Sequence, residues 1–276
     1  MDPNIFNTII VFPILNLLVA FYKLFESLKI PGEFGFSIIA LTVLVRIILH
    51  PLFKQQIDAG KKMQDIQPAL NALSKKYKND KTRLQKEQMK LYQEAGINPT
   101  LGCLLPLLQL PVFFGLYQTL SVFISSSGSQ KVIDSINKAL YFPALKIGSI
   151  DPWFFGINLT LTPAKAGPIF LIVPIVTGLL QFVQAQVSMP AKKEEVKKEG
   201  ELKKKDEKST GGDFQQALNM QMKYFFPVMI GWFSYNFPIG LALYWNIFSL
   251  FSILQYYQLR NSKKQNGHDK GHTGRS

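Results

Sequence analysis

Two ionisable side chains interrupt a stretch near the start of the chain that is otherwise almost wholly apolar, FSIIALTVLVRIILHPLF at 36–53. Arg46 lies inside this stretch, and His50 follows it one helical turn later. An arginine at the centre of a membrane costs about 2.5–3.5 kcal/mol on insertion scales, so such a residue usually faces a bundle interior or a water-filled cavity. A fixed positive charge in that position can bind a transient anion, such as a carboxylate, a phosphate or an acidic polypeptide segment.

Neutral polar residues in the neighbouring apolar stretches can surround such a charge. No Asp or Glu falls within these stretches, which argues against a structural salt bridge to Arg46. The residues expected to line a hydrated cavity are Thr42, Gln109, Gln118, Gln181, Gln184, Asn246, Ser249 and Gln255. Within this set, the candidate binding site for a substrate is formed by Arg46, Thr42, Gln109, Gln181 and Asn246.

Simpler interpretations of this pair stay open. Arg46 can snorkel, because the inner end of its stretch lies only roughly 10 Å away at the helical rise and a long side chain covers part of that distance. His50 is expected to be a hydrogen-bonded residue at the membrane interface. The single cysteine excludes an intramolecular disulfide and a CxxC-type metal or redox site, and we predict no cofactor.

The elements that position these residues are apolar segments long enough to cross a bilayer, whose core needs about 20 residues of helix. The stretches that qualify or nearly qualify are 36–53, 100–125, 167–189, 220–237 and 240–258. A sixth stretch, 5–25, is interrupted by Pro13 and has a polar side formed by Asn16, Tyr22 and Lys23. We expect residues 1–32 to form a helix in the outer interface, with a sixth span as the alternative.

The net charge of +13 is concentrated between the apolar stretches and predicts their orientation. Lys and Arg number ten in 54–98, eight in 190–213 and five in the tail from Arg260, against four in 126–165. Since cytoplasmic loops carry the excess of Lys and Arg, these three basic segments are predicted to be cytoplasmic and 126–166 external. The other meaning of such charge is binding to anionic lipid or RNA, and DNA is not an expected partner.

The segment 54–98 has the pattern of a cytoplasmic helical hairpin. A heptad stripe, with apolar residues at alternating spacings of four and three, is formed by Ala59, Met63, Ile66, Leu70, Leu73 and Tyr77. Asn79–Asp80 supplies a turn, Pro68 is expected to bend the first helix, and the second helix has Leu84, Leu91 and Ala95 on one face. The residues that define the hairpin are Met63, Ile66, Leu70, Leu73, Leu84 and Leu91.

Other segments lack the apolar residues needed for a core. Residues 190–219 are predicted to be a charged cytoplasmic linker, and 259–276 a disordered basic tail on the cytoplasmic side. Together these assignments predict an all-α polytopic membrane protein with five spans, at 33–53, 99–125, 167–189 and, as a pair, 220–258.

Three phrases in this order resemble membrane protein insertases of the YidC/Oxa/Alb superfamily, in particular its bacterial YidC-like members. They are EFGFSIIALTVLVRIILHPL with its intramembrane arginine, INPTLGCLLPLLQLPVFFGLY at 97–117, and FPVMIGWFSYNFPIGLALYWNIFSLFSILQ at 226–255. The resemblance covers most of residues 33–258. It implies a five-helix core enclosing a hydrophilic groove that is open to the cytoplasm and the lipid and closed outside, with Arg46 as the groove arginine.

The resemblance also implies a function without bond chemistry. Such proteins insert nascent or small membrane proteins into lipid, alone or beside the Sec translocon; the hairpin receives the substrate, and basic tails contact the ribosome. The implied location is the prokaryotic plasma membrane, with several spans and a cytoplasmic C-terminus.

The sequence leaves two other classes of function to weigh. A small anionic-solute transporter is the alternative, although the chain lacks the inverted repeat usual in transporters. An intramembrane enzyme is not expected, because the spans contain no carboxylate pair, HExxH or GxSxG motif.

Overall fold

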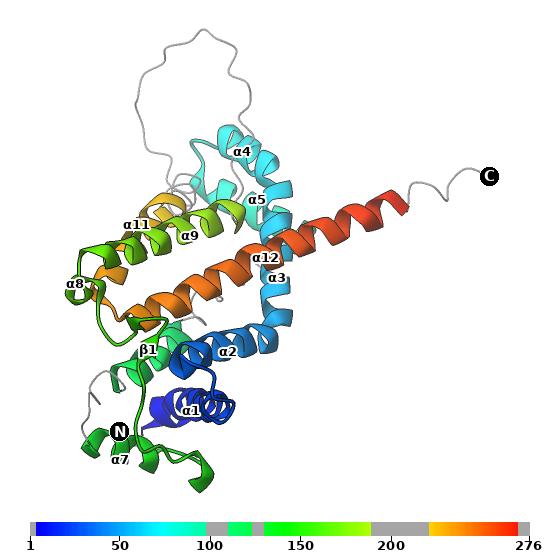
Figure 1. The fold of residues 1–276 in the computed structure, drawn as a ribbon. Helices are drawn as coiled ribbons and strands as arrows, with labels where there is room; N and C mark the ends of the chain where they lie inside the picture. Colours follow the sequence, from blue (N-terminus) through cyan, green and yellow to red (C-terminus); the bar gives the residue numbers. More distant parts are fainter. Residues whose placement is uncertain (1–3, 98–109, 123–129, 189–220, 270–276) are drawn as a thin grey trace.

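The computed structural model describes residues 4–97, 110–122, 130–188 and 221–269, the last eleven of these by their backbone alone. These residues are mostly helical (Figure 1). The predicted linker at 190–219 and the candidate residue Gln109 lie outside the described residues.

The bundle that holds the candidate site includes α2 (Glu33–Ile48), α9 (Ile172–Ser188), α11 (Phe226–Asn236) and α12 (Ile239–Asp269). α9 packs along both α11 and α12, and α12 packs on α2 as well. α9 and α11 approach closely at two glycines, since a Cβ atom placed on Gly231 would lie 3.3 Å from the Cα atom of Gly178. Small residues allow apolar helices to cross at such short range inside a membrane.

The N-terminal helix runs without a break from a π-helical turn, Asn7–Val11, into α1, Phe12–Ser27. It packs on α2 and gives buried apolar side chains to the main core. Figure 1 looks nearly along α1, whereas α2, α9 and α12 run across the view. The helix therefore crosses the direction of the bundle helices.

The first predicted span, 33–53, is not one straight helix. α2 ends at Ile48, and α3 (His50–Asp65) begins after Leu49 with a bend of 61° between them. Pro51 explains this break, because proline has no N–H to donate to the carbonyl of Ile47 and its ring clashes with that carbonyl in a continuous helix.

A second break divides the first arm of the predicted hairpin between α3 and α4 (Gln67–Lys76), whose first turn contains Pro68. α5 (Lys81–Glu94) begins at Asp80, whose carboxylate accepts the backbone N–H of Arg83 at 3.0 Å. α4 and α5 pack against one another. A small core separate from the bundle core is centred on Leu70, Tyr92 and Ile97.

The segment between the bundle helices is built from short elements. They are α7 (Gln130–Lys138), a 3-10 turn η2 (Pro143–Leu145), the antiparallel pair β1 (Trp153–Phe154) and β2 (Ile157–Asn158), α8 (Pro163–Ala166) and η3 (Pro168–Leu171). Backbone N–H groups at the start of α12 donate to this segment, from Ile239 to Leu161 at 2.9 Å and from Gly240 to Leu159 at 2.8 Å. The segment is therefore fixed to the end of the bundle at which α12 begins.

Two further contacts hold this segment to α1 and α2. The side chain of Asn16 accepts the N–H of Tyr141 at 2.7 Å and donates to the carbonyl of Ala139 at 3.0 Å. The ring of Phe154 fills a notch at the start of α2, where a Cβ atom on Gly35 would lie 2.1 Å from it. Glycine at this position gives the ring the space that it occupies.

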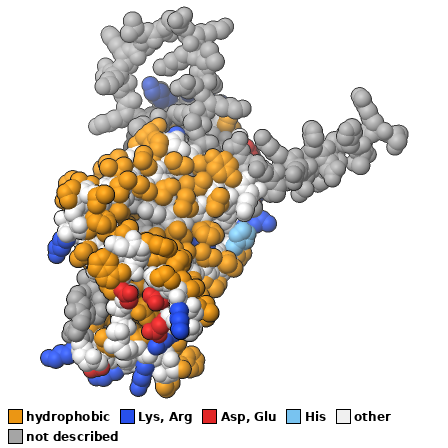
Figure 2. Space-filling model, in the orientation of Figure 1, with side chains coloured by type: hydrophobic (Ala, Val, Ile, Leu, Met, Phe, Trp, Pro, Cys, Tyr) orange, Lys and Arg blue, Asp and Glu red, His pale blue; other side chains and the backbone are white. Residues whose placement is uncertain are grey.

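Three described helices are long and apolar enough to cross a membrane, at Asn7–Ser27, Pro168–Ser188 and Ile239–Gln258. A fourth crossing results if the bent pair of α2 and α3 counts as one span, and a shorter apolar helix lies at Leu110–Val122. Hydrophobic side chains cover much of the face seen in Figure 2. The chain is therefore a helical membrane protein, and its exact number of spans stays a prediction.

The end of the chain differs from its prediction. α12 continues to Asp269, so the first part of the predicted basic tail, 259–276, has a helical backbone rather than a disordered one. The physical reason is that an existing helix adds one hydrogen bond for each residue it fixes and needs no new nucleus, even when the added residues bury little apolar surface.

Candidate functional site

Arg46 lies where α2 meets α12, and only 5% of its surface is exposed. Its guanidinium donates a hydrogen bond to the backbone carbonyl of Phe248 at 2.6 Å and another to the hydroxyl of Ser252. It also lies over two aromatic rings, 4.3 Å from the centroid of Phe53 and 3.6 Å from that of Phe248. None of the described carboxylates forms an ion pair with Arg46. The side chain therefore points into the bundle and has only neutral partners there.

Neutral polar side chains continue from Arg46 between α9, α11 and α12. The hydroxyl of Ser252 accepts from the amide of Gln184 at 3.2 Å, and that of Ser249 donates to the amide oxygen of Gln181 at 2.8 Å. Further along, the hydroxyl of Ser234 lies 3.4 Å from that of Thr177. The polar seam, as we call it, consists of Arg46, Thr177, Gln181, Gln184, Ser234, Asn246, Ser249 and Ser252.

Three buried atoms of the polar seam have no hydrogen-bond partner among the described residues. They are Nε of Arg46, Oε1 of Gln184 and Oδ1 of Asn246. A buried polar atom left without a partner costs about 1–3 kcal/mol. The seam therefore contains one donor and two acceptors whose hydrogen-bonding capacity is unused among the described residues.

The predicted site residues have different surroundings in the structure. Arg46 and Gln181 are buried in the polar seam, and Asn246 is partly buried. Thr42 is buried one turn before Arg46, but its hydroxyl donates to the carbonyl of Ile38 at 2.6 Å and is satisfied within its own helix. Gln118, which was expected to line the cavity, is exposed instead. Its helix presents that face outward.

His50 is hydrogen-bonded, as expected from the sequence. Its Nδ1 lies 2.9 Å from Nε2 of Gln255, a buried residue of α12. The contact joins the start of α3 to α12, close to the bend at Leu49. It therefore holds the start of α3 against the last helix.

Sequence reasoning missed Ser252, Phe53 and Phe248. Ser252 follows Ser249 at the same three-residue interval that separates Asn246 from Ser249, so helical spacing alone contained a signal for it. Phe53 follows Arg46 by seven residues, which is two helical turns, so a local signal for it existed. No local pattern points to Phe248, because its ring reaches Arg46 through the packing of α12 on α2.

Most of the residues that were predicted to define the hairpin lie in or around the small core. Leu70 belongs to it, Met63, Ile66 and Leu91 pack against it, and Leu84 is buried on α5. Leu73 is only partly buried. Tyr92 was missed, although it lies next to Leu91, and burial raises the pKa of its phenol.

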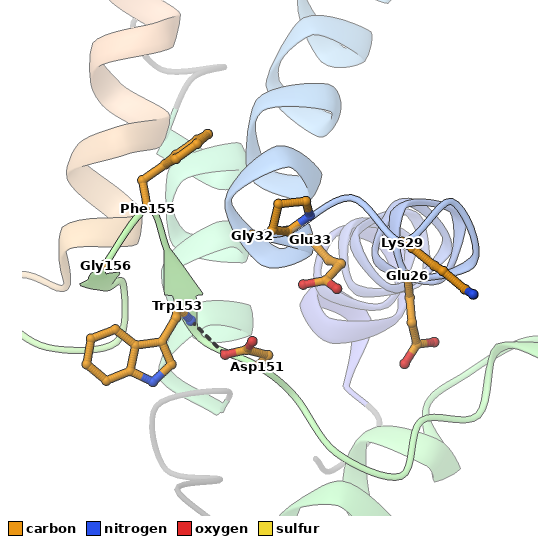
Figure 3. Close-up of a pocket in the computed structure, with 9 residues that line it drawn as sticks. Glu26, Lys29, Gly32, Glu33, Asp151, Trp153, Phe155 and Gly156 are labelled. Carbon is orange, nitrogen blue, oxygen red and sulfur yellow. Dashed lines mark hydrogen bonds between the residues drawn. The ribbon is translucent and has the colours of Figure 1, made fainter.

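A separate hollow of about 570 Å³ lies at the other end of α2 from Arg46. Its lining includes the carboxylates of Glu26, Glu33 and Asp151 together with the exposed ring of Trp153 (Figure 3). Asp151 accepts the backbone N–H of Trp153 at 3.0 Å, so one of these carboxylates helps to shape the β-hairpin. The hollow shares no residue with the polar seam.

Comparison with known proteins decides the family of this chain. The sequence matches the family profile described as 60Kd inner membrane protein over residues 10–266. The chain belongs to this family. This match confirms the resemblance to YidC-type insertases that was based on three sequence phrases. Together with the apolar helices, it indicates that the chain is a multi-pass membrane protein.

Named members of the 60Kd inner membrane protein family are similar over most of this chain. "Membrane protein insertase YidC" of Oceanobacillus iheyensis is 32% identical over 275 residues, which cover 96% of this chain and 89% of that protein. "Membrane protein insertase MisCA" of Bacillus subtilis is 30% identical over 264 residues, 94% of this chain and 80% of its own length.

The chloroplast relatives are longer than this chain. "Inner membrane ALBINO3-like protein 2, chloroplastic" of Chlamydomonas reinhardtii is 34% identical over 248 residues, which cover 87% of this chain. The match includes only 53% of that relative, so the chain spans about half of its length.

Proposed function

We propose that the chain is a membrane protein insertase and chaperone, which receives nascent or small membrane proteins in a hydrophilic groove and releases their helices into lipid. The observation that carries the proposal is Arg46, a buried positive charge whose described partners are all neutral. Membership of the 60Kd inner membrane protein family and the names of the bacterial relatives support it.

An insertase must lower the cost of moving a short hydrophilic tail across a layer in which its polar groups lose water. We assign this task to a groove whose described residues include Arg46, Thr42, Gln181 and Asn246. The positive charge holds an acidic tail while it passes, and the free donor and acceptors of the polar seam replace part of its lost hydration. Partitioning of the client's apolar helix into lipid then drives the process.

We assign the receiving step to the hairpin of α4 and α5. Its small core leaves most of its surface polar, and both helices carry exposed Lys or Arg residues. Such a surface suits a client before its insertion, and contacts with the ribosome or the Sec translocon on the same side are part of the proposal. The proposed groove opens toward this hairpin.

The proposed location is the prokaryotic plasma membrane, with the hairpin and the C-terminus in the cytoplasm. The excess of Lys and Arg in 54–98 and after Arg260 supports this orientation. The direction of α1 across the bundle helices supports its placement in the outer interface (Figure 1). The segment 126–166 is then external, at the closed end of the groove.

Reconstitution tests this function directly. The purified protein is placed in liposomes without any translocon and offered a single-span client with a short acidic tail, and insertion is scored as protection of the tail from protease. Protection above that in empty liposomes is the expected result. Folded protein that gives no protection, but releases a trapped inorganic anion from the liposomes, would overturn the proposal in favour of a transporter.

A further inference from the structure

Two aromatic rings from different helices contact the guanidinium of Arg46. Phe53 comes from α3 and Phe248 from α12, and their ring centroids are 6.0 Å apart at an interplanar angle of 72°. Both lie within cation–π distance of Arg46, at 4.3 and 3.6 Å. A third ring, that of Tyr244, packs against Phe248 at 5.9 Å and supports it from the preceding turn of α12.

The rings and the hydrogen-bond partners hold different parts of the cation. A guanidinium is planar, so it donates hydrogen bonds from its edges and stacks on aromatic groups through its faces. The edge partners in this structure are the carbonyl of Phe248 and the hydroxyl of Ser252. A carboxylate forms stronger, charge-assisted hydrogen bonds than either of these neutral groups. An acidic tail can therefore replace the hydrogen-bond partners while the cation–π contacts with the two rings remain.

Arg46 needs such a hold because of its position in the helix. It lies two residues before α2 ends at Ile48, where a long side chain is drawn toward the membrane surface. Its low exposure means that this movement has not taken place in the structure.

We infer that Phe53 and Phe248 are positioning residues that keep the guanidinium of Arg46 inside the bundle, at one fixed depth, so that an acidic client tail meets the charge there. This inference rests on the proposed function and adds to it the residues that place the charge. The rings themselves need not touch the client.

The first test measures the position of Arg46 without any client. The protein in liposomes is treated with phenylglyoxal, which modifies arginine, and the extent of modification at Arg46 is measured by mass spectrometry against the exposed Arg83. We expect Phe248→Leu and Phe53→Leu to raise the reactivity of Arg46 by about threefold to tenfold, the range that cation–π contacts support. Phe248→Tyr, which keeps an aromatic face, restores the protection.

Phe182→Leu is the matched control, since this ring packs against Tyr224 rather than against Arg46. Reactivity of Arg46 that stays at the original level in both Phe53→Leu and Phe248→Leu would overturn the inference. The two variants change different helices, so a folding failure of one leaves the other to decide.

The second test uses a pair of clients whose tails differ only in carrying Asp or Asn. We expect Phe248→Leu to lower the ratio of acidic-tail to neutral-tail insertion by about threefold or more, while neutral-tail insertion stays unchanged. An unchanged ratio would contradict a positioning role. If the original protein inserts neither client although Phe248→Leu raises the reactivity of Arg46, the proposed function fails and the placement of the charge by the rings stands.

Discussion

Arg46 on α2 and Phe248 on α12 are joined twice, by a hydrogen bond of 2.6 Å to the backbone carbonyl and by a ring that lies 3.6 Å from the guanidinium. One residue thus satisfies both an edge and a face of the cation. This double contact shows how the bundle buries a positive charge that has no carboxylate partner among the described residues. In our proposal, an acidic client tail replaces these neutral partners.

Ser252→Ala is predicted to destabilise the bundle. The hydroxyl of Ser252 accepts from Arg46 and from Gln184 and donates to the carbonyl of Phe248 at 3.0 Å, so its loss leaves buried donors without a partner. Hydrogen bonds between membrane helices contribute about 0.6–1.7 kcal/mol, and we expect a loss of unfolding free energy in this range. Denaturant titration in detergent measures it.

Thr119→Val is the control for this prediction. The hydroxyl of Thr119 is buried as well, but it donates to the carbonyl of Gly115 in its own helix at 2.8 Å. A smaller effect than that of Ser252→Ala is expected. Equal effects would show that Ser252 contributes nothing as a link between helices.

The crossing of α9 and α11 predicts that its two glycines differ in how well they tolerate replacement by alanine. A Cβ atom on Gly231 would lie 3.2 Å from the carbonyl of Pro174 and 3.3 Å from the Cα atom of Gly178, which are backbone atoms that cannot turn away. Gly231→Ala is therefore expected to lower the stability by roughly 1–3 kcal/mol, as overpacking does. Gly178→Ala meets its nearest atoms at 3.6 Å and is expected to cost less. Thermal unfolding of the two variants in detergent compares them, and a larger loss for Gly178→Ala would contradict the packing described.

The hairpin is predicted to depend on the residue that caps the start of α5. Asp80 caps this helix, so Asp80→Ala removes the acceptor for the N–H of Arg83 and is expected to cost about 1 kcal/mol locally. Hydrogen exchange of the backbone amides in 81–94 measures the loss of protection. Asp80→Asn, which keeps a capping oxygen, is expected to retain most of it. Equal protection in Asp80→Ala would mean that packing on α4 alone starts the helix.

The local breaks of the fold could be predicted where a single residue causes them. Pro68 lies in the first turn of α4, at the bend that it was predicted to cause, and Asp80, which was predicted to lie in a turn, caps α5. Pro51 also carries a local signal for the break at Leu49, but the continuous apolar run around it favoured one span.

The surroundings of Arg46 could be predicted only in part. Gln181, Ser249 and Asn246 stand out as polar residues in apolar helices, and the absence of Asp and Glu from the same stretches indicated neutral partners. The contact with Phe248 joins residues about 200 positions apart, so it depends on tertiary packing that no local pattern contains. The exposure of Gln118 has the same cause, because the orientation of a short apolar helix follows from its neighbours.

The most direct test of the central claim compares the original protein with Arg46→Gln in translocon-free liposomes, using the client tails that carry Asp or Asn. Loss of the charge is expected to lower protection of the acidic tail by about tenfold or more, equivalent to about 1.4 kcal/mol, and to leave the neutral tail almost unaffected. Protection of the acidic tail by Arg46→Lys is expected to lie between that by the original protein and that by Arg46→Gln. The ammonium of lysine keeps the charge but lacks the planar faces and edges of a guanidinium. Equal protection of the acidic tail by the original protein and by folded Arg46→Gln would contradict a role for this charge in receiving the client.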